Sequence, residues 1–234
     1  MNVVQASLTL IVWVAIVLLA NWIYKKQNEK IKLWKIALLT LAGLFSFSFT
    51  LPKDGEMLRI AILPLGVMFL FFFFRKKKEK WNIYRKYAWL GFWANYLFLA
   101  AILLSQPIYQ QIYIENQAST YLASFHDPTL TAIHPSGVEK SIDGEVLESF
   151  VSSMSQQSFP SLDWYYETKP YDQQAPVHVK EKFPYILTGV QAKWGSGIHS
   201  VIYVERDGKG LLVSTPKGQH YFRSEMGVFG EGEE

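Results

Sequence analysis

Four long apolar stretches alternate with lysine-rich segments over residues 1–105. They cover approximately residues 3–24, 33–51, 57–74 and 87–104. A helix needs about 20 apolar residues to cross the roughly 30 Å core of a bilayer. The pattern therefore predicts an all-α membrane domain of four transmembrane helices. The first stretch has no basic segment before it and no small-residue cleavage motif after it, so we expect a retained span rather than a signal peptide.

The distribution of lysine and arginine predicts the direction of these spans. Residues 25–35 and 75–86 hold twelve basic residues, whereas the loop between the second and third stretches holds only Lys53 and Arg59. Cytoplasmic loops carry the excess of positive charge. We therefore expect a multi-pass protein of the cell membrane, with loops 25–32 and 75–86 in the cytoplasm and both termini extracytoplasmic.

The predicted spans contain few side chains that could act in transport or catalysis within the membrane. No ionisable residue lies at mid-depth, which argues against an ion-coupled transporter or an intramembrane protease. Asn95 is the strongly polar side chain closest to a bilayer centre. We expect it to make a polar contact between helices, and a functional role is the alternative.

The pattern changes after residue 105. Apolar residues recur every three or four positions over 106–125, which predicts a helical stalk. Residues 126–226 then predict a small extracytoplasmic α+β domain, an antiparallel sheet with one packed helix, and 227–234 a flexible tail. The helix follows Asp143, a potential N-cap, with Val146, Leu147, Phe150, Val151 and Met154 on one apolar stripe. Strands are predicted at 129–134, 138–142, 185–193, 198–206, 211–215 and 219–223, with hairpin turns at 194–197 and 207–210.

Charge divides at the same place as the pattern. Residues 1–105 hold 14 basic and 4 acidic side chains, and residues 106–234 hold 9 and 16. The positive charge lies where a bilayer requires it, so we expect no nucleic-acid binding. The absence of cysteine excludes disulfides, zinc–thiolate sites and thiol catalysis.

Motifs for catalysis or for metal binding are weak in this sequence. The five histidines, His126, His134, His178, His199 and His220, show no ligand spacing. Gly195-Ser196-Gly197 lies between two predicted strands, whereas a nucleophile elbow requires a longer motif between a strand and a helix. We therefore predict a hairpin turn there and no catalytic, metal or cofactor-binding residue.

An aromatic and proline-rich segment, 160–176, is the predicted partner-binding site. Its rings are Trp164, Tyr165, Tyr166 and Tyr171. Prolines keep such a segment out of the centre of a sheet, and exposed Trp and Tyr are common binding anchors. The alternative is that these rings cover the open face of the sheet.

These observations together favour a membrane-anchored, non-enzymatic interaction or sensing module. Its expected partners are the lipid bilayer and another membrane or envelope protein. The alternative is an envelope enzyme or a small transporter component whose active groups converge only in three dimensions.

Overall fold

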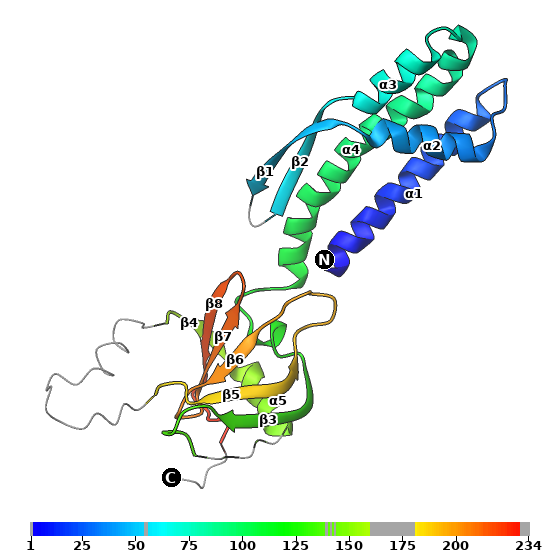
Figure 1. Cartoon of the computed structure of the whole chain (residues 1–234). Helices are drawn as coiled ribbons and strands as arrows, with labels where there is room; N and C mark the ends of the chain where they lie inside the picture. The colour runs from blue at the N-terminus through cyan, green and yellow to red at the C-terminus, as the bar shows by residue number, and fades with distance from the viewer. Residues whose placement is uncertain are drawn as a thin grey trace, which may run out of the picture. The chain divides into compact units, whose positions relative to one another are not determined.

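A computed structural model describes residues 2–53, 56–138, 140, 142, 144–159 and 181–229. The chain forms two compact units, Met1–Tyr109 and Gln110–Glu234, called here the N-terminal and C-terminal units. Within the described residues, Figure 1 shows four helices and a two-stranded hairpin up to the end of α4 (Lys78–Ile112), and a sheet with one α-helix after it.

The N-terminal unit contains the long helix α1 (Val3–Lys25), nearly all of a second long helix, α4 (Lys78–Ile112), and two short helices, α2 (Leu33–Leu44) and α3 (Leu65–Phe74). In the described part of the chain, only α1 and α4 are long and apolar enough to cross a membrane. With 12 and 10 residues, α2 and α3 are too short to cross it as helices. The structure therefore supports an N-terminal helical region with two candidate spans and does not contain four complete transmembrane helices.

A β-hairpin replaces half of each inner predicted helix. Strand β1 (Phe47–Lys53) pairs antiparallel with β2 (Glu56–Leu63). The prediction of helix over 33–51 and 57–74 was wrong there. Aromatic and hydroxyl residues alternate from Phe45 to Thr50, a period of two that is typical of a strand, and an Asp-Gly dipeptide separates the strands. Counting apolar residues alone concealed this alternation.

Small residues bring α2 and α4 into backbone contact. A Cβ atom added at Gly43 would lie 2.0 Å from the carbonyl oxygen of Ala88, and one added at Gly91 would lie 2.0 Å from that of Thr40. Such close approach is typical of helices packed in membranes. Asn95 of α4 donates from Nδ2 to the carbonyl oxygen of Leu44 at the end of α2, at 3.2 Å. Asn95 thus makes a polar contact between helices, while its depth in a bilayer stays a prediction.

The C-terminal unit is a six-stranded antiparallel sheet with one helix packed on it, as predicted. The strand order in Figure 1 is β3-β5-β6-β7-β8-β4. The elements are β3 (Ser124–Ala132), α5 (Gly144–Ser153), β4 (Ser155–Gln157), β5 (Tyr185–Gln191), β6 (Val201–Val204), β7 (Gly210–Thr215) and β8 (Gly218–Arg223).

The core of this unit lies between α5 and one face of the sheet. Leu147 and Phe150 of α5 are fully buried there against Leu211 and Val213 of β7. Because side chains alternate along a strand, Leu212 between them points to the opposite face. The predicted apolar stripe of α5 is confirmed at its centre, whereas Val146 is exposed. Asp143, the predicted N-cap, lies outside the described residues.

Several predicted boundaries in this unit were wrong. The helical stalk ends at Ile112, and only a 3-10 turn, Ala118–Thr120, follows before β3. Val138 and Ile142 belong to no strand. The flexible tail predicted over 227–234 cannot start at residue 227. Val228 is buried in the core, and its amide donates to the Gly208 carbonyl at 2.9 Å.

The predicted turn between β6 and β7 is confirmed, whereas the predicted turn at 194–197 lies within a longer connection, 192–200, between β5 and β6. Gly195 and Gly208 have φ of 76° and 72°, in the left-handed region that glycine adopts without strain. The chain therefore reverses direction where the glycines predicted it.

Candidate functional site

The face of the sheet that α5 does not cover carries a cluster of rings. We call it the aromatic face, and it consists of Phe159, Phe183, Tyr203, Leu212 and Tyr221. The centroids of the Phe159 and Phe183 rings lie 5.7 Å apart, and those of Phe183 and Tyr221 lie 6.1 Å apart. Ring pairs at these separations stabilise one another beyond the burial of their area. The face therefore holds an ordered apolar cluster, in which Phe183, Leu212 and Tyr221 are buried.

An open hollow of about 440 Å³ lies on this face. This volume falls in the range of small-molecule and side-chain pockets. Phe159, Phe183, Tyr203 and Leu212 supply its apolar lining. The remaining lining residues are Ile133, His134, Glu181 and Gln219. The hollow thus combines an aromatic lining with a small number of polar groups.

His134 and Glu181, which line the hollow together with Tyr203, are held by neighbouring backbone. The amide of Ser136 donates to Nδ1 of His134 at 3.2 Å, so this nitrogen acts as an acceptor, and the Ser136 hydroxyl lies 2.8 Å from it. Oε1 of Glu181 accepts from the amides of Lys182 and Phe183 at 3.0 and 3.3 Å. The Glu181 amide in turn donates to the Ser136 hydroxyl. These contacts join the loop that holds His134 and Ser136 to the segment that begins at Glu181.

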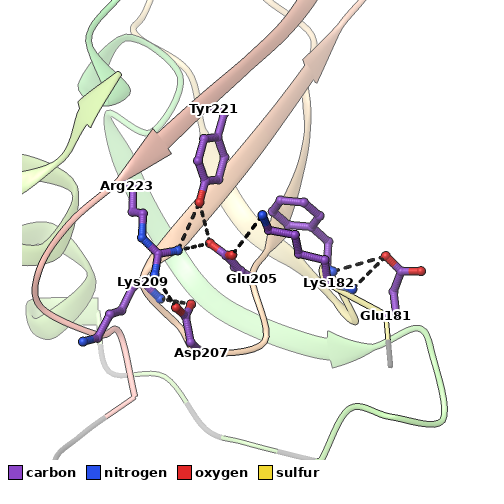
Figure 2. A network of polar contacts seen from close by, with 8 residues as sticks. Glu181, Lys182, Glu205, Asp207, Lys209, Tyr221 and Arg223 are labelled. Atoms are coloured by element: carbon purple, nitrogen blue, oxygen red, sulfur yellow. Dashed lines mark hydrogen bonds and ion pairs between the residues drawn. The ribbon is translucent and has the colours of Figure 1, made fainter. Parts of the chain in front are cut away.

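A buried carboxylate, Glu205, centres the polar network in Figure 2. Glu205 follows β6 and is 7% exposed. Its Oε2 accepts from the Tyr221 hydroxyl at 2.6 Å and from the Arg223 guanidinium. Lys182 Nζ lies 3.6 Å from its Oε1. Because both oxygens have charged or hydrogen-bonding partners, the cost of burying this charge is largely offset.

The same network joins β6, β8 and the β6–β7 turn. Arg223 of β8 donates from its second guanidinium nitrogen to Asp207 Oδ2 at 2.6 Å, and Asp207 Oδ1 accepts from the Lys209 amide. Two cations, Lys182 and Arg223, therefore face two carboxylates. Lys182 Nζ also lies 5.8 Å from the centroids of both the Phe159 and the Tyr221 ring, which links the network to the aromatic face.

The network sets the protonation of Tyr221 and Arg223. Burial, followed by the hydrogen bond to Glu205, raises the pKa of Tyr221 to about 12. Burial opposes the charge of Arg223, but its hydrogen bonds to Tyr221 and Asp207 and the nearby carboxylates raise its pKa above the ordinary value. At neutral pH Tyr221 is therefore a neutral donor and Arg223 a cation. Tyr221 and Arg223 therefore keep their protons near neutral pH.

The predicted partner-binding residues Trp164, Tyr165, Tyr166 and Tyr171 lie outside the described residues, as does His178. Within the part of the chain that is described, no three residues of the His, Cys, Asp or Glu type come together to hold a metal ion. Ser196 is buried and its hydroxyl accepts from the Ile198 amide at 3.2 Å, as in a hairpin turn.

Sequence reasoning missed Trp194, which is 84% exposed. Its backbone is fixed, because the Tyr113 hydroxyl donates to the Trp194 carbonyl oxygen at 3.0 Å and the Lys193 amide donates to Thr120 at 3.0 Å. An exposed Trp on an ordered turn loses little conformational entropy on binding, which makes it a good anchor. The available signal was a Trp directly before a Gly-Ser-Gly turn.

No family model, curated protein or solved structure matches this chain. The geometry of the site is therefore the basis for inferring function.

Proposed function

We propose that this chain is a multi-pass cell-membrane protein whose C-terminal unit is an extracytoplasmic, non-enzymatic binding module for another membrane or envelope protein. The observation that carries the proposal is the hollow of the aromatic face. It is open and lined by rings, and its histidine and carboxylate, His134 and Glu181, accept hydrogen bonds from the module's own backbone. Such a surface receives an apolar side chain of a partner more readily than it performs acid–base chemistry.

Four passages through the membrane are proposed, with α1 and α4 as complete helices. The two inner passages combine α2 with β1 and β2 with α3. The 12 residues of α2 rise about 18 Å and the seven residues of β1 about 23 Å, together more than the roughly 30 Å core. Large apolar side chains of the hairpin, among them Phe49, Met57 and Ile62, are exposed, and the unpaired edges of this two-stranded hairpin must be covered by protein wherever it lies in hydrocarbon.

The orientation in this proposal rests on the lysines and arginines of 25–35 and 75–86, which place both segments in the cytoplasm. Because the chain has no cysteine, single substitutions report sidedness without background. We expect Asn28→Cys and Asn82→Cys to resist a membrane-impermeant thiol reagent in intact cells and Ser155→Cys to react. All three positions are exposed in the structure. The reverse labelling pattern would overturn the orientation.

A photoreactive amino acid at Gln219 tests the binding hollow. Gln219 is exposed and lines the hollow on β8. Illumination of intact membranes should give one discrete protein adduct. The matched control is Ser149, an exposed position on α5, which covers the other face of the sheet. Equal adducts from both positions, or none from Gln219 in the native membrane, would contradict a binding role for this face.

A further inference from the structure

An apolar groove runs between α1 and α2 within the N-terminal unit. Its volume is about 440 Å³, and its walls include Trp13, Val17 and Ala20 of α1 and Leu33, Ala37 and Leu41 of α2. Asn21 and Tyr24 lie at the end of α1 that leads to the α1–α2 turn. The groove is therefore mostly apolar, with Asn21 and Tyr24 at the end next to that turn and Thr40 toward its other end.

The length of the groove matches one leaflet of a bilayer. On α1 it extends from Trp13 to Tyr24, a rise of about 16 Å, close to half of the roughly 30 Å hydrocarbon core. The α2 wall ends because this helix stops at Leu44. A transmembrane helix of a partner would need a wall across both leaflets, whereas a single acyl chain needs one.

Positive charge gathers at the end of the groove next to the α1–α2 turn. Lys25, Lys26, Lys30 and Lys32 lie in and around the α1–α2 turn, and all four are exposed. Lys26 lies 3.8 Å from the centroid of the Trp22 ring and Lys30 lies 5.1 Å from that of Tyr24. Among the described residues none of these lysines forms an ion pair with a carboxylate. Their charge is therefore available to an anion at the membrane surface.

We propose that the α1–α2 groove binds one anionic phospholipid of the cytoplasmic leaflet. One acyl chain lies along the groove, and the phosphate contacts the lysines of the turn. Each lysine near a membrane surface adds to the attraction for an anionic headgroup, so the charge complementarity selects the headgroup and the groove selects the chain. This inference rests on the membrane placement in the proposed function, and it adds a specific lipid site.

Filling the groove tests the acyl-chain half of the proposal. The full chain is purified in detergent and titrated with phosphatidylglycerol or phosphatidylcholine, and bound lipid is counted by native mass spectrometry. Wild type should retain one phosphatidylglycerol with at least a tenfold preference over phosphatidylcholine. Ala37→Phe and Ala20→Phe, which enter the groove from opposite walls, should each reduce retention about tenfold or more. Ala100→Phe, an exposed alanine on α4 outside the groove, is the matched control and should bind as wild type.

Charge removal tests the headgroup half. Lys26→Gln/Lys30→Gln/Lys32→Gln should abolish the preference for phosphatidylglycerol and leave a weak, headgroup-independent binding. Lys76→Gln/Lys77→Gln/Lys78→Gln removes the same charge from the other basic segment and should keep the preference. Loss of preference in both triple variants would show general attraction to a basic surface, and would overturn the site.

Failure of the lipid site can be distinguished from failure of the proposed membrane placement. If carbonate extraction releases the wild-type chain from membranes, the proposed function fails. If the chain stays in the membrane but Ala37→Phe and Ala20→Phe retain phosphatidylglycerol as wild type does, the groove proposal alone fails. If either groove variant does not purify as a folded protein, the other one and the lysine triple variant decide the result.

Discussion

The two units differ in what they expose. Large apolar side chains cover the N-terminal unit, as at Leu10 and Phe73, which are 66% and 71% exposed. In the C-terminal unit, the largest apolar side chains such as Phe150 and Phe222 are fully buried, and Trp194 is conspicuous because it is not. A surface of the first kind is stable in hydrocarbon and a surface of the second kind in water. An exposed apolar side chain is therefore favourable in a unit that lies in lipid and unfavourable in a unit that lies in water.

Buried polar groups differ between the units in the same way. Three buried side-chain atoms of the described residues have no hydrogen-bond partner: Gln27 Nε2, Thr40 Oγ1 and Ser46 Oγ. All three belong to the N-terminal unit. In the C-terminal unit the charged Glu205 is paired on both oxygens. The buried charge thus has hydrogen-bond or ion-pair partners on both oxygens, whereas some buried neutral groups have none. Burying an unpaired charge would destabilise the fold more than burying an unpaired neutral group.

The largest expected effect is on the core of the C-terminal unit. Leu147→Asp places a carboxylate where no exposed surface remains, and should lower the free energy of unfolding by several kcal/mol. Val146→Asp, one residue away on the exposed side of α5, should change it by less than about 1 kcal/mol. Chemical denaturation of residues 110–234 measures both variants. The segment must begin before residue 118, because Ala118, Tyr121 and Leu122 belong to the core.

Two substitutions at equally exposed positions test the comparison between the units directly. Leu10 is 66% exposed and Val138 is 67% exposed. If the exterior of α1 faces lipid, Leu10→Asp should impair membrane insertion, with a cost of about 3 kcal/mol near the centre of a span. Val138→Asp should be tolerated, because its surroundings are aqueous. Membrane fractionation measures the first and thermal melting the second. Equal tolerance at both positions would show that α1 does not lie in the bilayer.

Alkaline pH should weaken the C-terminal unit through Tyr221. The pKa of Tyr221 is raised to about 12 in the folded state, above the ordinary value of 10.0. Its contribution is therefore complete below pH 10 and is lost as pH rises toward 12, by up to about 2 kcal/mol. Tyr221→Phe should remove this part of the pH dependence. Parallel denaturation series of wild type and variant cancel the titration of all other groups, so two parallel curves would exclude the effect.

The smallest expected effect on stability is at Trp194. Because the ring is 84% exposed, Trp194→Ala should change the melting free energy by no more than about 0.5 kcal/mol. If the ring is a binding anchor, Trp194→Ala should lower the yield of the protein adduct crosslinked through Gln219, or of an adduct crosslinked through an exposed residue next to Trp194. A loss of stability near 3 kcal/mol would instead assign the ring to a packed site.

Local patterns predicted much of the C-terminal unit. Apolar spacing located α5, and Leu147, Phe150 and Val151 form its buried stripe. Glycines located both turns, because the left-handed conformations at Gly195 and Gly208 are rare for other residues. These features depend on neighbours within a few positions, which a sequence displays directly.

Other features depend on residues that are distant along the chain. The alternation from Phe45 to Thr50 predicts a strand, while the apolar run that contains it is long enough to predict a membrane-spanning helix. Only the pairing with β2 shows that the segment is a strand. Glu205 and Arg223 are 18 positions apart and become partners because β6, β7 and β8 are adjacent in the sheet. Val228 lies in a sequence resembling a frayed end, yet it completes the core.

The sequence by itself determined the two-part character of this protein. It also determined the distribution of basic charge, the position of α5 and the turns of the sheet, because each is fixed by local composition and spacing. Only the tertiary structure decided which rings gather on the face opposite α5, which carboxylate is buried with its cations, and where α1 and α2 leave a groove. Those properties arise from the register of strands and the packing of helices, and these bring together residues that no local pattern relates.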